Sequence, residues 1–249
     1  MPLTLRPMRD SDVGAYSRII ESAFVEGGVM PMFYPNGITP EISAHTRRQA
    51  LKILRKKPHA HIMVALDTDL RPEPGDYVDP QNQDSVDGKV TVEEHGNEEG
   101  RIVGIGYWKF YEKDRTDEEI RAEEEQDREA GFPPGANEKA MAAFFGALSK
   151  CKREKLGNRA HILLNILATD PKHHRRGIGA MQLKWGLDQA DRLGLPSYLE
   201  ASRIGKPLYA RWGYEEIGLL PFDTRDFGLK ENRVHTLMLR PPQTQNGKV

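Results

Sequence analysis

One stretch, from Ile162 to Leu193, constrains the fold of this chain more than any other. Its first seven residues, Ile162–Ala168, are almost continuously apolar and predict a buried strand. A polar loop follows, and Gly177 and Gly179 then open a segment in which apolar residues recur every three or four positions, which predicts a helix. A buried strand that leads through a short loop into a packed helix is typical of mixed α/β folds.

Further strands and helices are expected before and after this unit. Strands are predicted at 3–8, 61–66, 101–111, 197–201, 215–219 and 234–239, and helices at about 13–24, 40–56, 136–155 and 206–212. Residues 117–130 are polar on every side, which is typical of a solvated helix or a disordered stretch. Residues 27–39 combine glycines and prolines with apolar side chains, and predict a loop with an apolar surface to bury.

We expect a single domain over residues 1–240, followed by a polar tail at 241–249. Between Asp67 and Glu99 there are eleven acidic residues and two basic ones, with several prolines and glycines. Such a segment buries little apolar surface, so residues 67–100 are predicted to be a mobile surface insertion. Residues 114–157 are predicted to be a second, helical insertion.

Composition narrows the classes of function. The formal net charge of −1 gives no electrostatic case for nucleic acid. No apolar run reaches the roughly 18 residues of a membrane-spanning helix, and the first residues lack the apolar stretch of a secretory signal. The single cysteine, Cys151, can form no internal disulfide, which favours a reducing compartment. We therefore expect a cytoplasmic protein without a membrane or nucleic-acid partner, in which Cys151 is an ordinary thiol.

The loop Asp170–Ala180 has the features of an anion site. The first turn of a helix presents free backbone N–H groups and the positive end of the helix dipole. Glycine lets an anion approach the backbone closely, and the basic run that ends in Arg175 and Arg176 adds donors suited to phosphate. These features predict a phosphate or pyrophosphate cradle, although the glycines could instead simply cap a tightly packed helix. The pattern matches neither a Walker loop nor the dinucleotide fingerprint.

This loop resembles the signature of the Gcn5-related N-acetyltransferase (GNAT) superfamily. That signature is Arg/Gln-x-x-Gly-x-Gly/Ala after a strand, and here it reads His174-Arg-Arg-Gly177-Ile-Gly179, with His174 in place of Gln or Arg. The loop of that family holds the pyrophosphate of acetyl-CoA.

A second GNAT motif lies about 30 residues downstream. The family pattern is Asn-x-x-Ala-x-x-x-Tyr-x-x-x-Gly-Phe/Tyr, and Tyr209, Gly213 and Tyr214 match it, whereas Ser202 and Gly205 replace the usual Asn and Ala. Two motifs in the right order are more specific than either alone. The sequence around the two motifs is similar to that of a fungal branch of the superfamily.

The resemblance implies a GNAT-like α/β fold with a mostly antiparallel central sheet, helices on both faces, and splayed fourth and fifth strands that admit the cofactor. It implies transfer of an acetyl group from acetyl-CoA to a primary amine, which we expect to belong to a small molecule. Acetylation of a protein or peptide amine, and a non-catalytic CoA-binding regulatory module, stay open as alternatives. A homodimer is a further expectation, with Trp108 and Tyr111 as candidate contacts.

The same resemblance implies the residues of the cofactor site. The backbone of the fourth strand would pair with the pantetheine arm, the cradle would hold the phosphates, and Arg211 would reach them from the helix of Tyr209. The expected cofactor-binding residues are Leu167, Ala168, Thr169, His174, Arg175, Arg176, Gly177, Ile178, Gly179, Ala180, Ser202, Tyr209 and Arg211.

For catalysis, the resemblance makes Tyr209 the general acid that protonates the departing thiolate, although it could instead be a core tyrosine. Family members often carry the base on the fourth strand, but Leu163 and Asn165 stand there and neither takes a proton. Glu200 is the candidate base, with a water relay as the alternative. No metal is expected, because the histidines of the chain lack ligand spacing.

Overall fold

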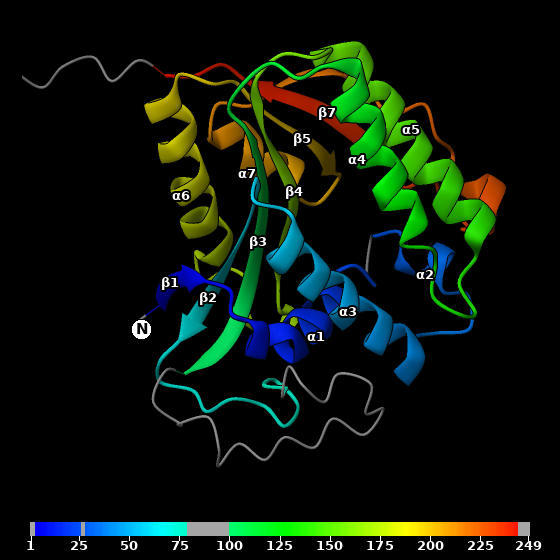
Figure 1. Cartoon of the computed structure of the whole chain (residues 1–249). Coiled ribbons are helices and arrows are strands. Elements are labelled where there is room, and N and C mark those ends of the chain that lie inside the picture. Colours follow the sequence, from blue (N-terminus) through cyan, green and yellow to red (C-terminus); the bar gives the residue numbers. More distant parts are fainter. Residues whose placement is uncertain (1–2, 26–27, 79–99, 244–249) are drawn as a thin grey trace, which may run out of the picture.

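The computed structural model describes residues 3–25, 28–78 and 100–243. Its centre is a seven-stranded sheet in the order β1-β2-β3-β4-β5-β7-β6 (Figure 1). The strands are β1 (Leu3–Pro7), β2 (Ala60–Asp67), β3 (Arg101–Tyr111), β4 (His161–Thr169), β5 (Ser197–Ser202), β6 (Glu215–Leu219) and β7 (His235–Arg240). Every neighbouring pair is antiparallel except β4 and β5, which are parallel. The predicted mixed fold with a mostly antiparallel sheet is confirmed.

Helices cover both faces of this sheet. They are α1 (Val13–Ala23), α2 (Met30–Phe33), α3 (Pro40–Lys56), α4 (Asp117–Glu129), α5 (Glu138–Leu156), α6 (Ile178–Leu193) and α7 (Lys206–Arg211). Alternate residues of a strand point to opposite faces, so Leu199 packs with α6 and α7, whereas Tyr198 packs with α2 and α5. The α1 and α3 helices cover the β2 and β3 side of the same face as α5.

Close contacts between glycines and large side chains fix α6 on β3. A Cβ at Gly186 of α6 would lie 2.2 Å from the Trp108 ring, and one at Gly104 of β3 would lie 2.4 Å from Ile178. Ile178 is the first residue of α6. The absence of side chains at these two glycines therefore lets α6 lie close against β3.

The Gly27–Thr39 segment was predicted to be a loop, yet it contains the short helix α2. Met32 and Phe33 of this helix are buried, and the Phe33 ring lies 5.5 Å from that of Phe144 on α5. Burial of these apolar side chains stabilises a helical turn. The surrounding glycines and prolines have a low helix propensity, so the sequence alone predicts a loop here.

The first part of the predicted acidic insertion is tied to the core. Asp67 and Asp76 are only 2% and 1% exposed, and Val78 packs among residues of α1 and β2. Asp76 is neutralised by Arg18 of α1 at 2.7 Å. Carboxylates that are paired with a cation can be buried. The acidic composition of residues 67–78 therefore does not by itself predict a mobile surface segment. Residues 79–99, where the rest of the predicted mobile insertion falls, and 244–249 of the predicted tail lie outside the described residues.

The polar segment at 117–130 forms the helix α4 because one carboxylate anchors it to the sheet. Glu123 accepts hydrogen bonds from Lys109 Nζ at 2.7 Å, Tyr111 Oη at 2.9 Å and Arg115 Nη1 at 2.7 Å. Burial alone would raise the pKa of Glu123, but bonds from His59 and Lys109 outweigh it and lower that pKa. Trp108 and Tyr111 are themselves buried, at 0% and 6% exposure, so they offer no surface for the dimer contact expected from the sequence.

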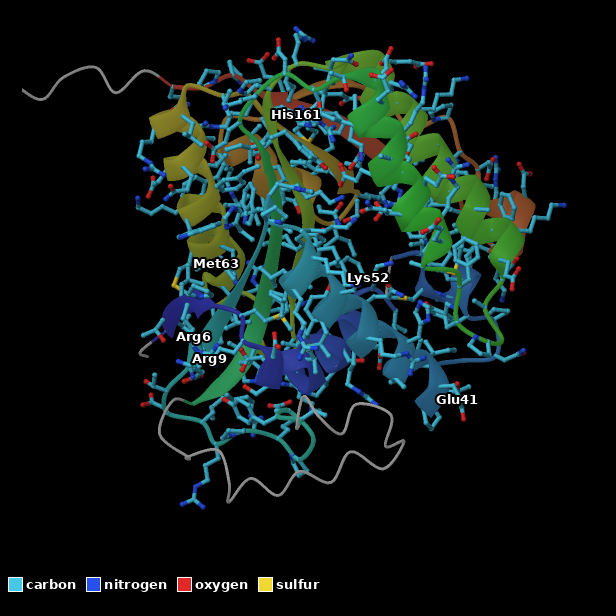
Figure 2. All side chains as sticks on the ribbon, in the orientation of Figure 1. Arg6, Arg9, Glu41, Lys52, Met63 and His161 are labelled. Carbon is cyan, nitrogen blue, oxygen red and sulfur yellow. The ribbon has the colours of Figure 1, made fainter. Side chains whose placement is uncertain are left out.

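Side chains fill the layers between the sheet and the helices (Figure 2). His161, labelled there, lies at the start of β4, whereas His173 and His174 follow the end of that strand. The three histidines thus do not gather at one site. Within the described ranges, no helix combines the length and the apolar character needed to cross a membrane.

Candidate active site

The parallel strands β4 and β5 separate shortly after they begin. They are paired only at Ile162 with Ser197 and at Leu163 with Tyr198. On its other side, β4 stays paired with β3 as far as Thr169. The edge of Ile166–Thr169 that faces β5 therefore has no ladder partner among the described strands, and its peptide groups can pair with another extended chain. The predicted splay of the fourth and fifth strands is confirmed.

A β-bulge lies at the point of separation. Leu164 is opposite Trp108 and Ile166 is opposite Tyr107, so Asn165 is the extra residue of β4. Asn165 is exposed. A bulge bends its strand and redirects the neighbouring backbone groups, which here turns the following part of β4 away from β5.

The loop after β4 has an unusual backbone. The Asp170 side chain accepts a hydrogen bond from the Lys172 N–H at 3.0 Å and caps a 3₁₀ turn at Pro171–His173. Arg175 has a φ of 61° and Gly177 a φ of 83°. Among the described residues, Arg175 is the one non-glycine residue with positive φ, and such conformations cluster at binding sites. The two residues with positive φ lie directly before the first turn of α6.

The start of α6 completes this cradle. Gly177 is the N-cap, so the N–H groups of Ile178, Gly179 and Ala180 lie in the first turn, where they have no intrahelical acceptor. A Cβ at Gly177 would meet no atom of the described residues within 4 Å. The backbone here is thus open to a ligand, and both the N–H groups and the helix dipole favour an anion.

The arginines of the cradle differ in what they contact. Arg176 donates to Asp67 at 2.5 Å and to His173 Nδ1 at 2.7 Å. Its side chain thus holds the loop against the end of β2. The role of Arg176 in cofactor binding stays a prediction. Arg175 and His174 are exposed, and the His174 Nε2 lies 3.2 Å from the carbonyl oxygen of Thr169.

The predicted residues of β4, α6 and α7 come together at Gly179. A Cβ at Gly179 would lie 3.1 Å from Leu208 of α7 and 3.7 Å from Leu167 of β4. Ser202, at the end of β5, accepts a hydrogen bond from the Gly205 N–H at 3.2 Å and so supports the start of α7. Arg211, at the end of α7, is exposed. One small region therefore holds the open edge of β4, the cradle and the helix of Tyr209.

Tyr209 is buried at 9% exposure, and its ring packs edge-on against Tyr214, with the centroids 6.0 Å apart. Gly205 makes room for it, because a Cβ there would lie 2.8 Å from the Tyr209 ring. Burial raises the pKa of Tyr209, so its hydroxyl stays protonated at neutral pH.

Glu200 points to the other face of β5. It shares that face with Tyr198, next to α5, whereas Leu199 and Ala201 face Tyr209. Glu200 Oε1 and Tyr198 Oη are buried and have no hydrogen-bond partner among the described residues. Burial raises the pKa of Glu200, and the charge of Lys152 on α5 offsets only part of that effect. A buried carboxylate with a raised pKa is suited to take up a proton.

Cys151 is buried on α5, and burial raises the pKa of its thiol. A thiol that stays protonated is a poor nucleophile. This agrees with its interpretation as an ordinary thiol.

Comparison with known proteins identifies the fold. No profile of a known family matches the chain. Its structure is similar to a mosquito arylalkylamine N-acetyltransferase-like protein 5b, with a TM-score of 0.59 and 15% identity over 96% of this chain and 100% of that one. It is also similar to a histone acetyltransferase HPA2 and related acetyltransferase from Corynebacterium glutamicum, with a TM-score of 0.54 and 19% identity over 99% and 100%. The chain has the fold of the GNAT acetyltransferases.

A third similar structure is a GNAT superfamily phosphinothricin acetyltransferase from Sinorhizobium meliloti in complex with AcCoA, with a TM-score of 0.52 and 16% identity over 100% of this chain and 93% of that one. In sequence, a probable acyltransferase SID5 from the fungus Ajellomyces capsulatus is 38% identical over 55 residues. That match covers 22% of this chain and 40% of the relative, so the chain spans less than half the length of the curated protein it matches.

Proposed function

We propose that this protein is an N-acetyltransferase that moves an acetyl group from acetyl-CoA to a primary amine. The observation that carries the proposal is the separation of β4 and β5 directly above an anion cradle. The resemblance of the cradle to the GNAT signature and the partial match to a probable acyltransferase support the same activity.

The chain offers two surfaces that fit acetyl-CoA. The free edge of Leu167, Ala168 and Thr169 matches the amide groups of a pantetheine arm, which would add to the sheet like a short strand. The N–H groups at the start of α6 match a pyrophosphate. The bound cofactor would supply the activated acetyl group as a thioester.

The proposed transfer is direct. The amine nitrogen attacks the carbonyl carbon of the thioester, a C–N bond forms and the C–S bond breaks. Tyr209 gives its hydroxyl proton to the leaving sulfur, and Glu200 takes the proton that the amine loses.

The positions of the two groups support this division of roles. Tyr209 lies on the α6 and α7 side of the sheet, and Glu200 on the α5 side. Acid and base thus flank the gap between β4 and β5 from opposite faces, and the amine would approach from the side of Glu200. A water relay to bulk solvent is the alternative to Glu200 as base.

We propose a small-molecule amine as the acceptor. The side from which it would approach is covered by α2 and α5, whose Phe33 and Phe144 rings are in contact. This cover leaves less room for the surface of a folded protein than for a small molecule. The absence of a disulfide partner for Cys151 supports a cytoplasmic setting.

The proposal is tested by replacing Tyr209. We expect Tyr209→Phe to lower kcat by about 100-fold, since that is the typical contribution of a general acid, and to leave the KM for acetyl-CoA unchanged. The measurement is release of free thiol from acetyl-CoA with a panel of primary amines.

Tyr214→Phe is the matched control. Tyr214 is also a buried tyrosine, and its hydroxyl is bonded to Ser197 Oγ at 2.6 Å, away from the gap. We expect this variant to lose stability but to keep its kcat. Equal rates of acetyl transfer by Tyr209→Phe and the unchanged protein would contradict the role of Tyr209 as general acid. If the unchanged protein acetylates no amine of the panel, the result would favour a CoA-binding module without catalysis.

A further inference from the structure

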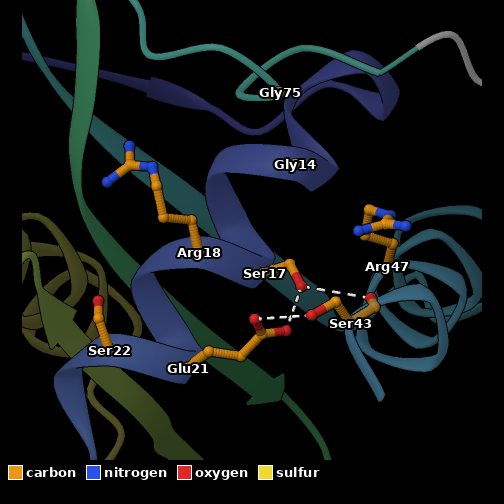
Figure 3. A pocket seen from close by; sticks show the side chains of 8 residues that line it. All are labelled: Gly14, Ser17, Arg18, Glu21, Ser22, Ser43, Arg47 and Gly75. Atoms are coloured by element: carbon orange, nitrogen blue, oxygen red, sulfur yellow. Dashed lines mark hydrogen bonds between the residues drawn. The ribbon is translucent and has the colours of Figure 1, made fainter. Parts of the chain in front are cut away.

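A pocket lies between α1, α3 and the turn at Gly75 (Figure 3). It has a volume of about 440 Å³ and opens to solvent. Its lining residues are Gly14, Ser17, Arg18, Glu21, Ser22, Ser43, Arg47 and Gly75. None of them belongs to the cradle, β4, β5 or α7, although Arg18 also binds Asp170 at the start of the cradle loop.

The wall of this pocket is firmly built. The turn at Glu73–Asp76 lies against the start of α1, where the Ala15 N–H donates to the carbonyl of Asp76 at 2.9 Å. A Cβ at Gly14 would lie only 1.8 Å from the carbonyl oxygen of Gly75. Such a close approach of two backbones is possible only because residue 14 is glycine.

Glu21 supplies a negative group inside the pocket. Its carboxylate accepts hydrogen bonds from Ser17 Oγ at 2.5 Å and from Ser43 Oγ at 2.9 Å, as Figure 3 shows. Among the described residues, no lysine or arginine forms an ion pair with it. The two serines hold the carboxylate in place. Burial raises the pKa of Glu21 and outweighs the charge of Arg47, which acts to lower that pKa. An ammonium group in hydrogen-bond contact would neutralise the carboxylate directly.

Arg47 supplies a positive group on which the charge of Glu21 acts without an ion-pair contact. Its Nε is buried without a hydrogen-bond partner, and within the part of the chain that the structure describes its guanidinium contacts no carboxylate at ion-pair distance. Arg18, in the same pocket, differs. It binds Asp76 at 2.7 Å, Asp170 at 2.6 Å and the carbonyl oxygen of Ile102 at 3.0 Å. Arg47 is therefore the cation that is available to a ligand.

We propose that this pocket binds a small molecule that carries both an ammonium and a carboxylate group, with the ammonium on Glu21 and the carboxylate on Arg47. A simple anion would satisfy Arg47 but would be repelled by Glu21. A simple cation would satisfy Glu21 but would leave Arg47 unpaired and close to a like charge. A zwitterion satisfies both groups, and this inference holds whether or not the chain transfers acetyl groups.

The test is calorimetric titration of the whole protein, without acetyl-CoA, against glycine, β-alanine, 4-aminobutanoate, 5-aminopentanoate and 6-aminohexanoate. This series varies the distance between the two charges. We expect one length to bind at least about tenfold more tightly than butylamine or butyrate, each of which carries a single charge.

Variants then assign the two contacts. Glu21→Gln and Arg47→Gln are each expected to weaken binding of that ligand by about tenfold or more. Arg48→Gln, the next residue of α3 and outside the pocket lining, is the control and should keep the affinity. Thermal unfolding checks that each variant is folded. If either Glu21→Gln or Arg47→Gln is unfolded, the remaining folded variant provides the test. Absence of binding across the series, or equal binding by the single-charge compounds, would overturn the proposal.

Discussion

At the level of single residues, ion pairing decides which side chains of the cradle can face an anion. Arg176 is held by Asp67, and Asp170 is held by Arg18. What remains for a bound phosphate is the backbone of the first turn of α6, with Arg175 and His174 exposed nearby. In our account the buried ion pairs shape the loop, and the backbone N–H groups bind the anion.

Removing Asp67 should therefore destabilise the protein. Asp67→Asn removes the buried carboxylate that pairs with Arg176, and breaking a buried pair typically costs about 3 kcal/mol in the free energy of unfolding. Urea unfolding measures this change. Asp69→Asn is the control because its side chain is exposed, and we expect a change within about 0.5 kcal/mol.

The same pair should also make stability depend on pH. Burial alone would raise the pKa of Asp67, but the bond from Arg176 and the N–H of Asp69 outweigh it and lower that pKa. The stabilisation is therefore complete above the pKa of an unfolded aspartate and is lost as the pH falls through the folded value. The difference between Asp67→Asn and the unchanged protein should shrink in acid, and a constant difference would contradict the pairing.

Glu200 leads to a prediction about the rate of acetyl transfer. A base must be ionised, and the pKa of Glu200 is raised by burial, so activity should fall as the solution is acidified through that raised value. Glu200→Gln should lower kcat by about 100-fold and remove this acid limb from the pH–rate profile. Glu215→Gln, an exposed site on β6, should leave the profile as it is. Persistence of the limb in Glu200→Gln would favour the water relay.

At the level of elements, contact between α6 and β3 sets the position of the cradle. Gly186→Ala should lower the free energy of unfolding by about 1–3 kcal/mol, because its methyl group overlaps the Trp108 ring. Gly146→Ala, inside α5, meets no described atom within 4 Å and should raise it by about 0.4–1 kcal/mol. Thermal or urea unfolding of the two variants should thus give opposite signs, and equal signs would contradict the packing described for α6.

Elements with a strong periodic pattern could be predicted from the sequence. Gly177–Leu193 was predicted as a helix and α6 occupies Ile178–Leu193, because its apolar stripe and the glycines at both ends are local signals. The α2 helix could not be predicted, because its stability depends on the distant Phe144. The charges that act on Asp67 and Glu200 could not be predicted for the same reason, since Arg176 and Lys152 are far from them in the sequence.

At the level of the whole molecule, the sheet brings the cradle, Tyr209 and Glu200 to the gap between β4 and β5. The order of the strands places β4 and β5 side by side in parallel, and their early separation opens the sheet at its centre. The cradle lies at the end of β4, and Tyr209 and Glu200 flank the gap from opposite faces. The motifs predicted this site because they are short and contiguous, whereas the pocket of Glu21 and Arg47 joins two helices and has no sequence pattern.

The most direct test of the central claim is calorimetric titration of acetyl-CoA into the unchanged protein, Gly177→Ala and Gly194→Ala. Both glycines have positive φ, 83° and 65°, and they stand at opposite ends of α6. Alanine should cost about 1–2 kcal/mol of stability at either position, but only at residue 177 would its methyl group fill the space of the anion. We predict binding by the unchanged protein and by Gly194→Ala, with at least tenfold weaker binding by Gly177→Ala. No binding by the unchanged protein, or equal binding by all three, would contradict the account.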